Sequence, residues 1–160
     1  MNKIRNRKNN KGFSLVELII VIAIMAILAG ILIPQFVKYI NNSKVSGDIQ
    51  QSENIYNAVA AAYADSQGVA SVAGLTFDDN MHEVTGPVAE KLEMGKTAPT
   101  CKVNSDMTFY YTCTTKGAVA VYISDKTGRD GNPYDPTKDT KISPSIEGAN
   151  AADWGGKASE

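Results

Sequence analysis

The strongest constraint on the fold is an uncharged stretch of sixteen residues, 18–33, with a single carboxylate, Glu17, directly before it. With its apolar flanks the stretch covers 13–37, and as a helix it would be about 37 Å long at about 1.5 Å per residue. A helix of that length crosses a bilayer hydrocarbon core of about 30 Å. The sequence therefore predicts a membrane-spanning helix near the amino end.

Positively charged residues gather in the twelve residues before this stretch, at Lys3, Arg5, Arg7, Lys8 and Lys11. Basic segments stay in the cytoplasm, so we expect residues 1–12 inside the cell and the chain beyond Pro34 outside it. Without these five charges, 11 of the 16 basic side chains remain against 17 acidic ones, a net charge of −6. A chain with this net negative charge has no general positively charged surface, and we expect no specific nucleic-acid partner.

The position of the small residues separates this segment from an ordinary secretory signal. Such a signal is cut after its apolar run, beside a pair of small residues. Here the small residue lies before the run, at Gly12. A cut after Gly12 would remove the charges, keep the apolar helix and leave Phe13 as the new amino terminus.

The stretch KGFSLVEL, followed by the uncharged run and Pro34, resembles the class III signal of type IV prepilins. The resemblance covers residues 11–66. It implies that a prepilin peptidase cuts after Gly12 and methylates the amine of Phe13. It also implies an inner-membrane precursor, an assembly platform with a motor, and a helical filament of identical subunits outside the cell.

Within this resemblance Glu17 has a physical role. A carboxylate in lipid is costly and needs a partner, and cleavage would supply one as the charged amine of Phe13. If helices pack in a staggered filament, Glu17 can meet the amine of a neighbouring subunit. At about 4 Å and an effective dielectric constant of about 20, the attraction is roughly 4 kcal/mol. The alternative is that Glu17 only marks the interfacial end of an anchor helix.

Gly30 and Pro34 interrupt the apolar run, and proline in a helix removes a hydrogen bond and clashes with the preceding turn. We expect a kink at least. In assembled pili of similar sequence the helix is unwound before the equivalent proline, so the resemblance makes 26–34 the stretch that melts on assembly. The alternative is a static kink.

Beyond Pro34 the sequence predicts a helix with one apolar stripe over 38–67, ending near Ser66 and Gly68. The predicted stripe consists of Val45, Ile49, Ser52, Tyr56, Val59 and Tyr63. Residues assigned to the other sides are Lys38, Asn42, Lys44, Asp48 and Glu53. A sheet is needed to cover the stripe.

That sheet is expected in the remainder, 68–160. Residues 107–113 alternate in polarity, 119–123 resume the alternation, and Lys116-Gly117 suits a turn, which predicts an antiparallel hairpin. The tyrosines at 110, 111 and 122 suit a sheet core better than a binding platform. We expect a connection with a short helix near 88–92, and a tail of loops with at most one short edge strand near 141–146.

The fold class is thus α+β: a long amino-terminal helix, whose apolar half protrudes, packed on a small antiparallel sheet. It divides into the leader 1–12, the membrane and filament-core segment 13–37, the amphipathic segment 38–67 and the globular part 68–160.

Cys101 and Cys113 both lie in the exported part, where an even count favours a disulfide. Such a staple would stabilise the fold by about 2 to 4 kcal/mol. Two free buried thiols are the alternative.

Asp125, Asp130 and Asp135 are weak calcium candidates, because hard cations need several oxygen ligands from a flexible loop. The stretch DGNPYDP is similar to a calcium-binding loop in the major pseudopilin of type II secretion systems. Solvated turn residues are the alternative. We expect no other cofactor.

No nucleophile elbow, phosphate-binding glycine loop or zinc-spaced ligand set occurs, so we expect no enzyme. The leading hypothesis is a structural subunit, a major pilin, of a type IV pilus that supports adhesion, twitching motility or aggregation. One alternative is a major pseudopilin of a secretion or DNA-uptake pseudopilus. Another is a monomeric, membrane-anchored binding module.

Overall fold

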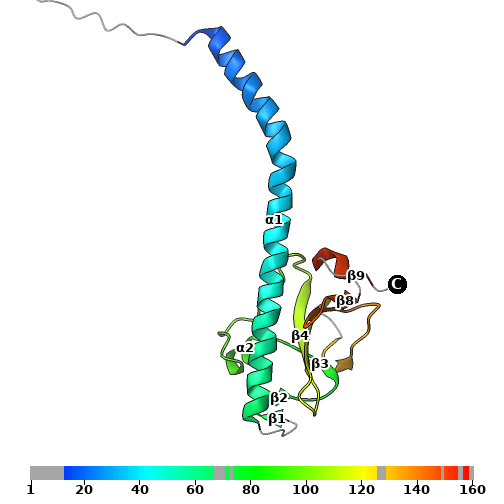
Figure 1. The fold of residues 1–160 in the computed structure, drawn as a ribbon. Coiled ribbons are helices and arrows are strands. Elements are labelled where there is room, and N and C mark those ends of the chain that lie inside the picture. Colours follow the sequence, from blue (N-terminus) through cyan, green and yellow to red (C-terminus); the bar gives the residue numbers. More distant parts are fainter. Residues whose placement is uncertain are drawn as a thin grey trace, which may run out of the picture. The chain divides into compact units, whose positions relative to one another are not determined.

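The computed structural model describes residues 13–66, 71–72, 74–125, 129–148, 150–154 and 157–158. It shows a long helix, α1 (Leu15–Asp65), followed by a curled and mainly antiparallel sheet, so the predicted α+β class is confirmed (Figure 1). The chain divides into two compact units, Met1–Ile40 and Asn41–Glu160, which we describe in turn.

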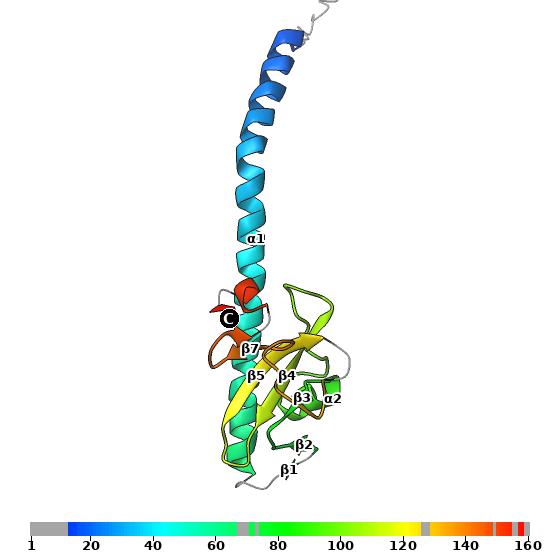
Figure 2. The same ribbon diagram turned by 90° about the vertical axis from the view of Figure 1, so that its right-hand side faces the viewer.

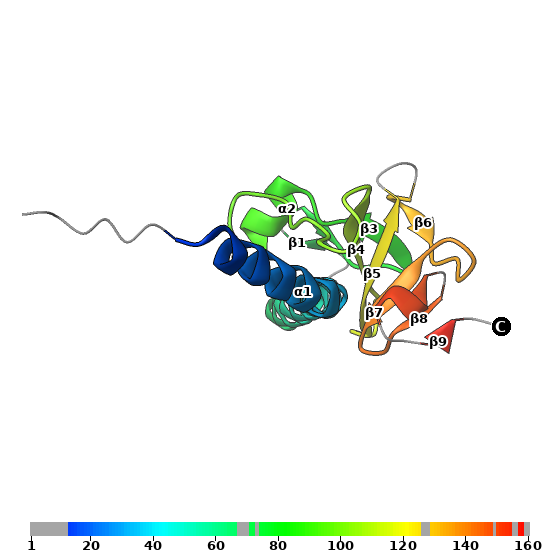
Figure 3. The same ribbon diagram turned by 90° about the horizontal axis from the view of Figure 1, so that it is seen from above.

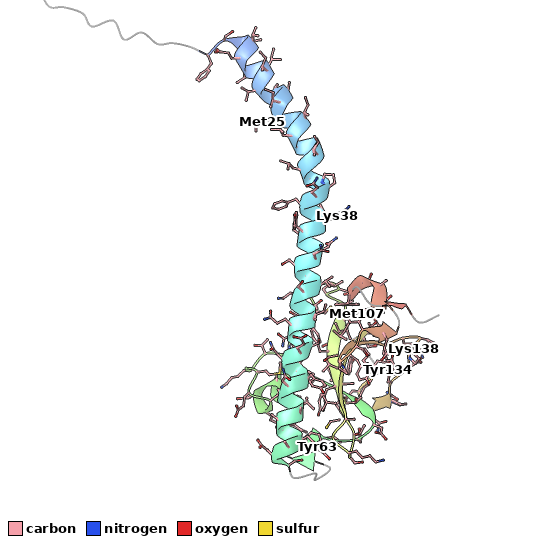
Figure 4. The ribbon with its side chains drawn as sticks, in the orientation of Figure 1. Met25, Lys38, Tyr63, Met107, Tyr134 and Lys138 are labelled. Atoms are coloured by element: carbon pink, nitrogen blue, oxygen red, sulfur yellow. The ribbon has the colours of Figure 1, made fainter. Side chains whose placement is uncertain are left out.

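The first unit contains the amino-terminal part of α1, an unbroken helix with Pro34 inside it. Its large apolar side chains are all exposed, from Leu15 to Ile40, and Met25 projects outward in Figure 4. By length and composition alone this part of α1 is apolar enough to cross a membrane, with a mean hydropathy of 3.0.

In the second unit, α1 buries four residues at helical spacing: Asp48, Ser52, Ile55 and Val59. Ser52 and Val59 belong to the predicted stripe, and its other four members lie half-buried at the margins. The placement of Asp48 on another side of the helix was wrong, because Asp48 is fully buried at the centre of the face. A helix face is set by position as much as by residue type.

The core of the sheet is the hairpin of β4 (Met107–Cys113) and β5 (Val119–Asp125), as predicted. The two strands pair antiparallel over their whole length, from Met107 with Asp125 to Cys113 with Val119. Gly117 forms the turn with φ +83°, a left-handed conformation that suits glycine.

The strand order of the large sheet is β6-β3-β4-β5-β7-β8-β9. Figure 2 labels β3, β4, β5 and β7 of this sheet. The remaining elements are β1 (Ser71–Val72), β2 (Leu75–Thr76), β3 (Asn80–Glu83), α2 (Gly86–Lys91), β6 (Asn132–Pro133), β7 (Thr140–Ser143), β8 (Glu147–Gly148), the 3-10 helix η1 (Ala151–Trp154) and β9 (Lys157–Ala158). The predicted short helix is therefore present, as α2. A loop tail with one edge strand was wrong: β7 pairs with both β5 and β8. Strands of two residues are too short to show an alternating pattern.

Both faces of β4 are buried, although alternating polarity is the pattern of a strand with only one buried face. On the inner face, Phe109 and Tyr111 belong to the same core cluster as Ile55 and Val59 of α1. Figure 3 shows α1 beside β4 and β5 in the view from above. On the other face Tyr110 and Tyr122 form a second cluster with Met81, against which Tyr134 packs. All three strand tyrosines are buried, which confirms that they are core residues rather than a binding platform.

The predicted disulfide between Cys101 and Cys113 is wrong, because both thiols are free and buried. Thr100 forms an antiparallel bridge with Thr108, which places Cys101 beside the Met107 end of β4. Cys113 lies at the other end, about 20 Å away at about 3.3 Å per residue. Bridged cysteines have Cα atoms within about 7 Å of each other.

Candidate functional site

The first turn of α1 is closed by its own side chains. Ser14, directly before the helix, donates its backbone N–H to Oε2 of Glu17 at 2.9 Å. The N–H of Val16 donates to Oγ of Ser14 at 3.3 Å. This S-x-x-E arrangement is a capping box, in which a serine and a glutamate satisfy amides that the helix leaves unpaired. Glu17 therefore serves the fold locally through one hydrogen bond.

Beyond that bond, Glu17 lies in apolar and exposed surroundings. It is the only acidic residue between positions 13 and 47. A shallow surface hollow around it is lined by Phe13, Glu17, Leu18, Ile20 and Val21. The helix amino terminus carries a partial positive charge that favours a carboxylate in this turn. No full positive charge faces Glu17 among the described residues, so the carboxylate has spare acceptor capacity.

The expected processing site adjoins this turn. The side chain of Phe13 is 92% exposed. Gly12 lies outside the described residues, so cleavage after it and methylation of Phe13 stay predictions.

Gly30 and Pro34 meet at one weak point of α1. Proline has no N–H, so the helix lacks the hydrogen bond that would run from residue 34 to the carbonyl of Gly30, four positions earlier. A methyl group at Gly30 would meet nothing within 4 Å. The missing bond and the missing side chain therefore coincide within one turn.

The structure does not bring the calcium candidates together. Oδ1 of Asp130 accepts the N–H of Glu83 at 2.9 Å, and Asp135 accepts hydrogen bonds from Thr137, which hold the pKa of Asp135 below its usual value. Asp125 is exposed at the end of β5. Within the described part of the chain, no three His, Cys, Asp or Glu side chains are grouped to hold a metal ion.

Asp48 is a site that the sequence interpretation missed. Its fully buried carboxylate accepts hydrogen bonds from the N–H of Lys102 (2.7 Å), the N–H of Val103 (2.9 Å), Sγ of Cys101 (3.2 Å) and Nε1 of Trp154 (3.4 Å). It ties the 101–103 segment and η1 to α1. Its spacing from Ser52 and Ile55, four and seven residues, was the one available signal.

The two thiols are unsuited to nucleophilic chemistry. Burial raises the pKa of Cys101 to about 11, and Asp48 adds to this rise. Burial alone raises the pKa of Cys113 to about 11. Both therefore stay protonated at neutral pH, and the thiolate is the reactive form.

The segment that contains the first turn of α1 is similar to known proteins. Residues 7–33 match the family model described as the prokaryotic N-terminal methylation motif. The chain is 42% identical over 57 residues to the type IV major fimbrial protein FimA of Dichelobacter nodosus, covering 36% of each chain. It is 36% identical over 77 residues to a fimbrial protein of Pseudomonas aeruginosa (48% of this chain, 49% of that one). It is 39% identical over 61 residues to the type IV major pilin protein PilA of Myxococcus xanthus (38% and 28%).

The chain is type IV pilin-like. The matched part spans less than half the length of each of these relatives, and no solved structure matches the chain. The pilin-like resemblance therefore rests on the methylation motif, on the similarity to the major pilins and on the α+β arrangement of the fold.

The globular part of this pilin-like chain also contains an isolated histidine between two carboxylates. Nε2 of His82 lies 2.8 Å from Oδ1 of Asp78, and Nδ1 lies 3.8 Å from Oδ1 of Asp130. The His82 ring packs on Tyr111 with centroids 5.6 Å apart. Burial raises the pKa of Asp78, but hydrogen bonds from His82 and Asn80 outweigh it and leave the pKa below its usual value. This arrangement ties the segments before and after the hairpin to β3.

Proposed function

We propose that this chain is a major structural subunit of a type IV pilus and that it polymerises through the apolar part of α1. The observation that carries the proposal is the exposure of every large apolar side chain from Leu15 to Ile40. Soluble monomers rarely expose an apolar surface of this extent, and such a surface marks an interaction site. Lipid would cover it before assembly, and copies of the same helix afterwards.

Processing would prepare the first turn for this step. We propose that a prepilin peptidase removes residues 1–12 after Gly12 and methylates the amine of Phe13. The precursor would lie in the inner membrane with its amino end in the cytoplasm, as the positive-inside rule predicts for the basic leader. The cut would place a positive charge one residue before Ser14, the current hydrogen-bond donor to Glu17.

Glu17 would then select and hold the incoming subunit. Its carboxylate has spare acceptor capacity and apolar surroundings, where a full charge without a partner is costly. The methylated amine of Phe13 on a neighbouring subunit is a matching cation. At about 4 Å and an effective dielectric constant of about 20, their attraction is roughly 4 kcal/mol.

The weak point at Gly30 and Pro34 supports a change of helix length during assembly. The helix already lacks one hydrogen bond there, so unwinding 26–34 would break fewer bonds than unwinding any other turn of the apolar segment. We propose that this stretch melts as subunits leave the bilayer under the action of an assembly platform and its motor. The resulting surface filament would support adhesion, twitching motility or aggregation.

Glu17→Ala in the native cell tests the proposal. We expect the variant to accumulate in the membrane and to give at least about tenfold fewer labelled surface filaments by electron microscopy, because the interaction of roughly 4 kcal/mol is lost. Glu53→Ala is the matched control, since Glu53 is an exposed carboxylate on the same helix and should leave the filament count unchanged.

Three outcomes separate the hypotheses. Normal filament numbers in Glu17→Ala would contradict the role of the carboxylate in assembly. Wild-type protein that stays in the membrane without any filament would indicate an anchored binding module. Filaments that stay short and depend on a secretion or DNA-uptake system would indicate a pseudopilin.

A further inference from the structure

The loop 129–139 includes the edge strand β6 and packs on the outer face of the sheet through Tyr134. The first and last residues of this loop form an ion pair. Arg129 donates to Asp139 from both Nε, at 2.8 Å to Oδ1, and Nη2, to Oδ2. Nη2 also donates to the carbonyl of Pro133 at 3.0 Å, within the same loop. The guanidinium thus joins the two ends of the loop and its middle.

The carboxylate of Asp139 is fully buried, and both of its oxygens are occupied. Oδ1 accepts from Oγ of Ser124 at 2.6 Å as well as from Arg129, and Oδ2 accepts from the N–H of Asp135 at 2.7 Å as well as from Arg129. Two-point pairing between arginine and carboxylate is strong and fixes geometry as well as charge.

This donor set does not fit the calcium ion that the DGNPYDP stretch suggested. Calcium takes six to eight oxygen ligands. The most buried carboxylate of the loop, Asp139, already faces a guanidinium, and Asp130 and Asp135 direct their oxygens to Glu83 and Thr137. The loop carries its own cation at the place where an external one would be needed.

We propose that Arg129 is a built-in cation that closes this loop in place of calcium. The proposal does not depend on the assembly mechanism. It makes the fold of this surface independent of calcium. The pair of Arg129 with the buried Asp139 holds the 129–139 loop in a single conformation against the sheet.

The pair of Arg129 and Asp139 would hold two contacts of the loop in place. Tyr134, labelled in Figure 4, packs on Tyr122 with ring centroids 4.8 Å apart. On the other side, Gly148 of β8 approaches the loop so closely that a Cβ there would lie 2.3 Å from the carbonyl oxygen of Asp139 and 2.7 Å from the hydroxyl of Tyr134. If the loop opened, both contacts would be lost and the cluster of Met81, Tyr110 and Tyr122 would be exposed.

Hydrogen–deuterium exchange of the full chain in detergent tests the proposal, because the exchange rates of the loop amides show whether the loop stays closed. The N–H of Asp135 donates to Asp139, and the N–H of Gly131 donates to the carbonyl of Met81 at 2.7 Å. In Arg129→Ala we expect exchange over 129–139 to be at least about tenfold faster, with exchange in β4 and β5 unchanged, since removal of one partner leaves a buried charge uncompensated. Lys138→Ala is the matched control, because Lys138 is an exposed cation of the same loop that pairs with Asp135 rather than with the buried Asp139.

Two further arms keep the test decisive if Arg129→Ala fails to fold. Arg129→Lys keeps the charge but loses the two-point geometry, and we expect an intermediate increase in loop exchange. In the wild-type chain, added calcium or a chelator should leave loop exchange unchanged. Slower exchange with calcium, or wild-type loop protection in Arg129→Ala, would overturn the proposal.

Discussion

Glu17 and Asp48 are two carboxylates of the same helix, and their surroundings differ in every respect. Glu17 is exposed and accepts one hydrogen bond from its own turn. Asp48 is fully buried and accepts four, from two segments that lie more than fifty residues away in sequence. A buried carboxylate with saturated bonding is committed to the fold, whereas one with spare capacity is available to another molecule.

The most severe test of this comparison is the substitution of Asp48 by alanine. Four donors would lose their acceptor, and unsatisfied buried donors cost about 1 to 3 kcal/mol each, so we expect the free energy of unfolding to fall by about 3 kcal/mol or more. Urea unfolding of the full chain in detergent measures it, followed by fluorescence of Trp154, the single tryptophan.

In the same experiment Glu17→Ala should change the free energy of unfolding by less than about 0.5 kcal/mol, as for exposed positions in general. Asp48→Asn keeps one acceptor oxygen and should fall between wild type and alanine. The contrast between Asp48 and Glu17 would be contradicted if Asp48→Ala unfolded at the same urea concentration as the wild type. It would also be contradicted if Glu17→Ala destabilised the globular part as much as Asp48→Ala does.

Substitution of one glycine in the globular part and one in the apolar part of α1 should change stability in opposite directions. A Cβ at Gly117 would lie 2.6 Å from the ring of Tyr63 and would occupy a backbone with φ +83°, so we expect Gly117→Ala to lower the free energy of unfolding by about 2 kcal/mol. Gly30→Ala meets nothing within 4 Å and should raise helix stability by up to about 1 kcal/mol.

Thermal unfolding followed by circular dichroism distinguishes the two glycine variants. Gly95→Ala is a control for strain alone, because Gly95 has φ +108° but no neighbour within 4 Å of its Cβ position. Equal losses in Gly95→Ala and Gly117→Ala would show that the contact with Tyr63 adds nothing.

The smallest expected effect concerns the thiols that replace the predicted disulfide. Both have a pKa raised from 9.0 to about 11 in the folded chain. A group whose pKa is higher in the folded state stabilises fully below its unfolded pKa, and this contribution is lost as the pH rises through the folded value. We therefore expect stability to decline between about pH 9 and pH 11, and less steeply in the double variant Cys101→Ala, Cys113→Ala.

Alkylation provides an independent readout for the same thiols. Iodoacetamide at neutral pH should modify neither cysteine in the folded chain and both after unfolding, and reduction should leave the intact mass unchanged. A gain of two mass units on reduction would restore the disulfide interpretation.

Features encoded in short, local patterns could be predicted from the sequence. The apolar run, the hairpin turn at Gly117 and the end of α1 near Ser66 each depend on neighbours within a few residues, and the structure contains all three. The position of Glu17 in the signal was likewise visible, and the S-x-x-E pattern was the local signal for its capping bond with Ser14.

Features that depend on distant contacts could not be predicted. The burial of Asp48 requires the amides of Lys102 and Val103, more than fifty residues away, and no local pattern announces that pairing. The cysteine prediction failed for a similar reason: an even count says nothing of register, and the bridge from Thr100 to Thr108 separates the two thiols. The loop 129–139 reads as solvated turns because its cation, Arg129, lies ten residues from its partner Asp139.

We propose that Glu17 pairs with the charged amine that processing would create at Phe13 of a neighbouring subunit. Intact-mass and amino-terminal analysis of the protein in sheared surface filaments tests it most directly. We expect a chain that begins at Phe13, carries one methyl group on its amine and keeps its mass on reduction. A filament subunit that retains Met1, or a cellular protein cut beyond residue 33, would contradict it.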